Sequence, residues 1–196
     1  LPELMARYPK AVLLCSAKAQ DLLSTHLGIP AERLRVVKDG EEVSLGDKTL
    51  RFVYTPWVHW PETMCTYVPE SKLLFSCDFF GSHLATSDIF VTDKAQTLRA
   101  AKRYFAEIMM PFRAAIQGNL KKVEALDFDM IAPSHGPVYD DPAFIVEAYR
   151  EWTSPKLRNE VCLPYVSMHG STKLMVHHLV DALVKRMDAI VARVGG

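Results

Sequence analysis

Residues 55–83 read TPWVHWPETMCTYVPESKLLFSCDFFGSH, and the predicted fold is built around this segment. It contains two candidate metal ligands, His59 and Asp78, and each stands where an apolar run breaks off. A third candidate, His135, occupies the same position after a later run, in IAPSHG. The three residues are far apart in sequence, so they belong to different strands and can meet only when the chain folds. The sequence therefore predicts a site assembled beyond the ends of strands.

Imidazole and carboxylate groups together form a ligand set for zinc, iron or manganese. Aspartate can also bridge two metal ions, which histidine does not normally do, but three ligands are too few for two ions. Each residue also has a simple structural interpretation. His59 could be packed beside Trp57 and Trp60, and Asp78 and His135 could be turn residues. That all three follow predicted strands in one chain favours the metal site.

The remaining histidines are weaker candidates. His83 follows Gly81 and Ser82, and we expect it to support the site or to be structural. His26 lies in a predicted helix and is expected at the surface. His177 and His178 are adjacent on another predicted helix, so they cannot both face one site.

The composition indicates an ordinary globular protein. Hydrophobic residues make up 49% of the 196 residues, and 23 basic residues balance 23 acidic ones, which argues against nucleic-acid or anionic-membrane partners. No apolar run approaches the roughly 20 residues that span a bilayer, and LPELMARYPK is not a signal peptide. The cysteines (Cys15, Cys65, Cys77 and Cys162) form no C-x-x-C pair, which predicts reduced thiols in a cytoplasmic protein.

Hydrophobic patterning predicts a layered α/β architecture. Strands are expected at Lys10–Ser16, Leu34–Lys38, Glu42–Leu45, Thr49–Tyr54, Lys72–Cys77 and Phe128–Pro133. Helices are expected in the opening LPELMARYP and at Ala17–Leu27, Ala95–Gln117, Asn119–Ala125 and Pro142–Thr153. Gly28 should end the second helix, and Pro111 should kink or split the third.

The character of the sequence changes after the last of these helices, where a polar segment begins. The polar segment TSPKLRNE is interpreted as a linker, followed by a buried strand at Val161–Val166. The next turn, SMHGST, places hydroxyls, a glycine and backbone N–H groups at a helix N-terminus, which suits a phosphate. An ordinary helix-capping turn would look similar. The helix opens at Thr172, and its spacing favours continuation through Ala189–Val194, although that segment also fits a second strand.

TPWVHWPETMCTY, LLFSCDFFGSH and IAPSHGPVY resemble the metallo-β-lactamase-like domain of flavodiiron proteins, also called A-type flavoproteins. VSMHGSTKLM resembles the start of the flavodoxin domain that follows in the same family. The resemblance implies an N-terminally truncated αββα sandwich over residues 1–153 and a linker over 154–160. Residues 161–196 would then be the first β-α unit of a flavodoxin-like, FMN-binding domain.

The resemblance also implies roles for individual residues. His59 and His135 match ligands to individual irons of a non-haem diiron site, and Asp78 matches the carboxylate that bridges them. The residues that match the FMN phosphate loop are Ser167, Met168, His169, Gly170, Ser171 and Thr172. The family's other iron ligands form a His-x-Glu-x-Asp-His motif just before the segment that resembles LPELMARYP. This sequence lacks the motif and opens with an uncapped helix, so we expect the chain to start a few residues after it.

The function implied by the resemblance is reduction of oxygen to water, of nitric oxide to nitrous oxide, or of both. Electrons would come from rubredoxin or another reductase and pass through FMN to the diiron centre. The family forms head-to-tail homodimers, and neither nucleic acid nor a membrane is an expected partner. One alternative is a zinc-dependent hydrolase of the lactamase-like superfamily. The other is a truncated, inactive relative.

Overall fold

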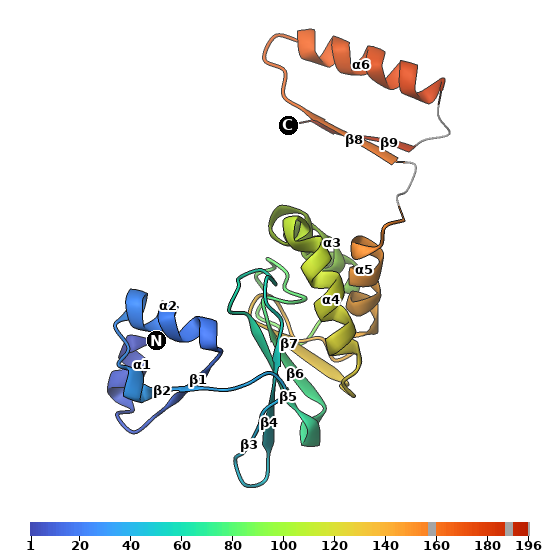
Figure 1. Ribbon diagram of the computed structural model, residues 1–196. Coiled ribbons are helices and arrows are strands. Elements are labelled where there is room, and N and C mark those ends of the chain that lie inside the picture. The colour runs from blue at the N-terminus through green and yellow to red at the C-terminus, as the bar shows by residue number, and fades with distance from the viewer. Residues whose placement is uncertain (157–159, 187–189, 196) are drawn as a thin grey trace. The chain divides into compact units, whose positions relative to one another are not determined.

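The computed structural model describes residues 1–156, 160–186 and 190–195 (Figure 1). The chain divides into two compact units, Leu1–Thr153 and Ser154–Gly196, and each is described by itself. The predicted linker, residues 154–160, lies partly outside the described residues. Its assignment, like the assignment of the two flanking domains, stays a prediction.

The first unit opens with a small β-α-β layer. It contains helix α1 (Pro2–Arg7), strand β1 (Leu13–Cys15), helix α2 (Ala17–Leu27), the 3₁₀ turn η1 (Ala31–Arg33) and strand β2 (Leu34–Val36). The two strands pair in parallel and are shorter than predicted, whereas α2 has its predicted bounds. Ser16 caps α2 by accepting a hydrogen bond from the Ala19 N–H, and Gly28 ends it at φ 62°. That left-handed conformation favours glycine.

A five-stranded sheet forms the centre of the first unit (Figure 1). Its strands, in sheet order, are β3 (Glu42–Ser44), β4 (Thr49–Tyr54), β5 (Met64–Val68), β6 (Leu73–Cys77) and β7 (Met130–Pro133). A 3₁₀ turn, η2 (Pro69–Ser71), joins β5 to β6. Neighbouring strands are antiparallel except for β6 and β7, which are parallel. The sequence-based prediction lacks β5, in which half-buried Met64 and Thr66 alternate with buried Cys65 and Tyr67.

Helices pack along one side of this sheet (Figure 1). They are α3 (Lys94–Tyr104), a π-helical turn η3 (Phe105–Met109), a 3₁₀ turn η4 (Met110–Phe112), α4 (Arg113–Glu124) and α5 (Ala143–Thr153). The predicted split at Pro111 is confirmed, because the proline lies in η4 between the two α-helices. Sheet and helices share one buried core, which includes Leu74, Ile131, Met109, Ile116 and Ile145.

The second unit contains β8 (Glu160–Tyr165), α6 (Ser171–Val184) and β9 (Ile190–Gly195). The two strands pair in parallel, so the helical continuation favoured by spacing is wrong over Ile190–Val194, and Ala189 lies outside the described residues. Backbone pairing with β8 satisfies the hydrogen-bonding groups of this Val-rich segment and outweighs its helical spacing. None of the helices within the described ranges is long and apolar enough to cross a membrane.

The core at β6 provides a test of this packing. Leu74 is fully buried, so Leu74→Ala should lower the free energy of unfolding by about 2–5 kcal/mol through lost burial and a residual cavity. Urea denaturation measures the change. Leu45→Ala, at a side chain that is 61% exposed, is the control and should change stability by less than about 0.5 kcal/mol. Equal effects of the two substitutions would contradict the packing described here.

Candidate metal centre

The three predicted ligands come together around one carboxylate. The His59 Nε2 atom lies 3.4 Å from Asp78 Oδ2, and the His135 Nε2 atom lies 3.3 Å from Asp78 Oδ1. Each carboxylate oxygen therefore faces a different imidazole. Asp78 is the most enclosed of the three, with 15% of its side chain exposed, against 24% for His59 and 48% for His135.

Strand pairing explains why Asp78 and His135 meet. Cys77 at the end of β6 is in register with Pro133 at the end of the parallel strand β7. The Ser134 N–H donates to the Cys77 carbonyl at 2.7 Å, which carries the pairing one residue further. Asp78 and His135 therefore leave the same edge of the sheet.

His59 arrives from the loop between β4 and β5. The Thr55 N–H donates to the Thr63 carbonyl at 3.0 Å and closes the loop at its base. Within the loop, the Trp57 N–H donates to the Trp60 carbonyl at 2.7 Å. The His59 ring lies against the rings of Trp60 and Phe112, with centroid distances of 5.6 and 6.5 Å.

Of the four non-glycine residues with positive φ in the described part of the chain, three lie close to the candidate ligands, and the fourth, Lys72, follows η2. Trp57, Cys77 and Phe80 have positive φ angles of 64°, 53° and 64°, although none is glycine. Such conformations cost on the order of 1–3 kcal/mol each and persist only where the surroundings hold them. They occur two residues before His59, one before Asp78 and two after it. Holding these side chains in their orientations therefore lowers the stability of the fold.

A close backbone contact fixes His135. The Ser82 N–H donates to the His135 carbonyl at 2.9 Å. The next residue, Gly136, has φ 89°, and a Cβ atom there would lie 2.1 Å from Ser82 Oγ. Only glycine fits, both for its conformation and for the space.

Two aromatic rings extend the site beyond the predicted ligands. The His83 ring lies 5.5 Å from that of His135 and 4.6 Å from that of Tyr104, between centroids. Tyr104, missed by the sequence analysis, is 1% exposed, and its hydroxyl has no hydrogen-bond partner among the described residues. Burial raises the pKa of Tyr104, and the negative charge of Asp78 raises it further, so the hydroxyl keeps its proton. A tyrosine at the end of a helix gives no sequence signal for such a place.

The nearby cysteines are protonated at neutral pH. Burial raises the pKa of Cys65 to about 12, and burial together with the charge of Asp78 raises the pKa of Cys77. Cys15, Cys65 and Cys77 are free thiols, as predicted. The side chain of Cys162 lies outside the described residues. Thiols held in this state are poor metal ligands, because metals bind the thiolate.

The chemistry of the donors fits two metal ions only in part. A carboxylate whose two oxygens face different imidazoles is suited to bridging, with one imidazole for each ion. Three donors leave each ion short of ligands. Accordingly, no group of three or more His, Cys, Asp or Glu side chains in the described part of the chain is arranged to hold a metal by itself. A complete site needs further ligands.

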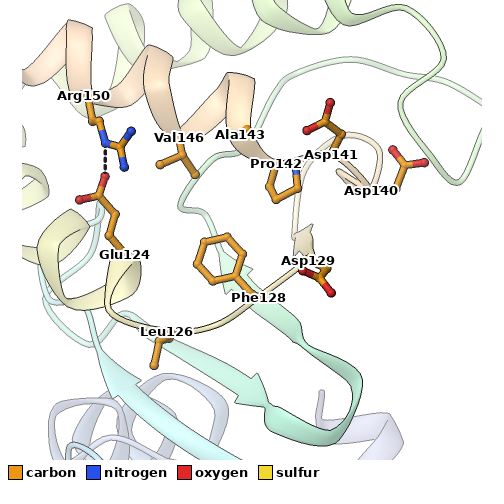
Figure 2. Close-up of a pocket in the computed structure, with 10 residues that line it drawn as sticks. All are labelled: Glu124, Leu126, Phe128, Asp129, Asp140, Asp141, Pro142, Ala143, Val146 and Arg150. Carbon is orange, nitrogen blue, oxygen red and sulfur yellow. Dashed lines mark hydrogen bonds and ion pairs between the residues drawn. The ribbon is translucent and has the colours of Figure 1, made fainter.

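A separate cavity lies away from the candidate ligands. It has a volume of about 560 Å³ and lies between α5 and the segment that joins α4 to β7 (Figure 2). Phe128 and Val146 form an apolar patch, and at one end Arg150 pairs with Glu124 at 2.6 Å. None of the three candidate ligands lines it, so this cavity is not part of the site.

The predicted phosphate loop lies in the second unit. Gly170 precedes α6 with φ 84°, and its carbonyl accepts a hydrogen bond from the Leu174 N–H at 3.1 Å. The Ser167 hydroxyl accepts one from the Lys173 N–H at 3.4 Å. Met168 is 87% exposed. The loop therefore leads into a helix N-terminus, the arrangement on which the phosphate prediction depends.

Substitution of Gly136 tests the contact that fixes His135. Gly136→Ala should lower the free energy of unfolding by more than about 1 kcal/mol, because the methyl group meets Ser82 and the backbone conformation disfavours alanine. Gly118→Ala in α4 is the matched control, since nothing lies within 4 Å of its added Cβ, and it should stabilise by up to about 1 kcal/mol. Thermal denaturation of both variants measures the difference. A neutral Gly136→Ala would contradict the geometry.

Comparison with known proteins places the chain in a family. A family model described as "ODP family beta lactamase" matches residues 1–136. A nitric oxide reductase of Moorella thermoacetica is 38% identical over 188 residues, which cover 93% of this chain and 47% of that protein. The chain thus spans about half the length of the curated relatives it matches.

Solved structures with a similar fold point to the same family. The flavodiiron protein from Giardia intestinalis has a TM-score of 0.85 at 28% identity, covering 95% of this chain and 47% of that one. Rubredoxin oxygen:oxidoreductase from Desulfovibrio gigas has a TM-score of 0.82 at 29% identity, covering 92% of this chain and 47% of that one. The metallo-β-lactamase-like α/β fold predicted from sequence is confirmed. Given a family model over residues 1–136 and matches along more than nine-tenths of its length, the chain belongs to the flavodiiron proteins.

Proposed function

We propose that this chain is part of a flavodiiron oxidoreductase that reduces oxygen to water, nitric oxide to nitrous oxide, or both. The observation that carries the proposal is the placement of Asp78 between His59 and His135, with one carboxylate oxygen toward each imidazole. The three side chains would hold two irons together with further ligands. When bound, two irons can supply two electrons to a diatomic gas.

The chain's own residues shape the space around those ligands. The Trp60 and Phe112 rings pack against His59 and restrict the access of water to that imidazole. The Tyr104 hydroxyl keeps its proton and has no hydrogen-bond partner among the described residues, so it can donate a hydrogen bond to a group held near Asp78. His135 is more exposed than His59, which leaves the approach open on its side.

The second unit would supply the flavin site. Gly170 allows close approach of the backbone at the start of α6, and the hydroxyls of Ser167, Ser171 and Thr172 can donate to phosphate oxygens. Met168 and His169 would contribute backbone N–H groups. FMN accepts and releases electrons singly, which suits transfer to iron. This assignment is supported by the family resemblance and by the loop preceding a helix N-terminus.

The partners follow from the same family. We infer an electron donor of the rubredoxin type, or another reductase, and a head-to-tail homodimer. The name of the Desulfovibrio gigas relative includes rubredoxin and oxygen, and that of the Moorella thermoacetica relative includes nitric oxide.

The free thiols of Cys15, Cys65 and Cys77 support a reducing, cytoplasmic location.

Metal analysis of the full-length protein tests the function. Asp78→Asn should reduce bound iron at least roughly tenfold, because a bridging ligand loses its charge and one acceptor oxygen. Asp140→Asn, at an exposed carboxylate, is the control and should leave the iron content unchanged. Assays with a reduced donor, prepared without air and started by adding a known amount of oxygen or nitric oxide, should show consumption of one or both gases by the wild-type protein. Bound zinc, with ester hydrolysis and no gas consumption, would overturn the proposal in favour of a hydrolase.

Two tyrosine variants test whether the Tyr104 hydroxyl is without a hydrogen-bond partner before metal binds. Tyr104→Phe should raise the free energy of unfolding of the iron-free protein by about 1 kcal/mol, because it removes a buried hydroxyl without a partner. Tyr139→Phe should lower it by about 1 kcal/mol, because that hydroxyl donates to the Phe80 carbonyl at 2.8 Å. Urea denaturation measures both. Destabilisation by Tyr104→Phe would show that its hydroxyl already has a partner.

A further inference from the structure

Asn119 is a polar residue on the buried face of α4. It is 6% exposed and shares that face with Ile116, Leu120 and Val123, which are buried apolar side chains. A buried amide without a hydrogen bond costs on the order of 1–3 kcal/mol, and asparagine is also a poor residue for a helix interior. A residue kept at such a position needs a compensating contact.

The contact is with the loop that carries His59. The Asn119 Nδ2 atom donates to the carbonyl of Pro56 at 2.8 Å, across 63 positions of sequence. This bond joins α4 to the loop Thr55–Thr63, which we call the His59 loop. The Pro56 carbonyl belongs to the same peptide unit as the Trp57 N–H, which donates to the Trp60 carbonyl at 2.7 Å. One peptide plane is thus held at both ends, two residues before His59.

The restraint on this peptide plane matters because the residue that follows it has a strained backbone conformation. Trp57 follows the held peptide plane and has φ 64°, a conformation that a non-glycine residue keeps only under constraint. If the plane turned, Trp57 could relax to a negative φ, and the path of the chain into His59 would change. Lys122, one turn further along α4, also donates to the loop's edge at the Tyr54 carbonyl at 3.0 Å, but it is 44% exposed. The bond of Asn119 is shorter and partly buried, whereas that of Lys122 is exposed, so the Asn119 bond is the stronger restraint.

We propose that Asn119 is a positioning residue, which holds the His59 loop in the strained conformation that turns the His59 imidazole toward Asp78. The inference rests on the proposed function, in which His59 is an iron ligand. In this role Asn119 would contact neither the metal nor the substrate. It acts through the Pro56–Trp57 peptide plane, as outer groups that orient metal ligands do.

The test uses the full-length protein with histidine labelled by ¹⁵N, first without metal. Asn119→Leu keeps similar volume and removes the donor, and the ring signals of His59 should shift or broaden while those of His135 stay unchanged. Gln117→Leu, on the exposed face of the same helix, is the matched control and should move neither. Asn119→Ser serves if the leucine variant folds poorly. Serine can bond to a carbonyl of its own helix but is too short to reach Pro56.

Cobalt(II) titration provides the second readout, since its visible absorption reports the ligands. The affinity should fall roughly 10–100-fold in the Asn119 variants and stay at the wild-type value in the control. Unchanged His59 signals, equal shifts of His59 and His135, or loss of the whole fold in both Asn119 variants would overturn the positioning role. A wild-type protein that binds no cobalt would instead refute the metal site, while the His59 signals would still report the role of Asn119.

Discussion

The parallel pairing of β6 with β7 is the constraint on which the site depends. It brings the ends of two strands that are far apart in sequence to one edge of the sheet, with Cys77 in register with Pro133. Asp78 comes directly after the end of β6, and His135 comes two residues after the end of β7. The other strand pairs in this sheet are antiparallel and closed by short connections, so this is the one long crossover, and α3, α4 and the intervening turns fill it. The helices that cover the core therefore also deliver Tyr104 and Asn119 to the site.

The site combines satisfied and unsatisfied groups in a way that suits binding. The backbone that carries the candidate ligands is restrained by the Ser82 bond to His135, the Asn119 bond to Pro56 and the closed base of the His59 loop. The Tyr104 hydroxyl, by contrast, is buried and has no partner within the described ranges, and Trp57, Cys77 and Phe80 keep positive φ angles at a cost in stability. A fold optimised only for stability would remove these features. Their concentration around Asp78 is what a site prepared for a bound group would show.

The features that could be predicted from the sequence are those that local sequence patterns determine. The end of α2 follows from Gly28, the helix break follows from Pro111, and the convergence of His59, Asp78 and His135 follows from their places after apolar runs. It missed β5, whose short alternating pattern directly follows an aromatic loop, and it favoured helix where β9 pairs with β8. Tyr104 and Asn119 could not be found as site residues, because their roles arise from tertiary contacts across the crossover. Asn119 alone left a trace, as an amide among apolar neighbours at helical spacing.

In the proposed site, Asp78 would bridge two metal ions, each held by a different histidine. A crystal structure of the full-length iron-loaded protein, with data collected at the iron absorption edge, tests it most directly. We predict two separate iron peaks, one bound by His59 and one by His135, with a different oxygen of Asp78 on each. A single peak bound by both histidines, or a peak that follows the zinc edge instead, would contradict the claim.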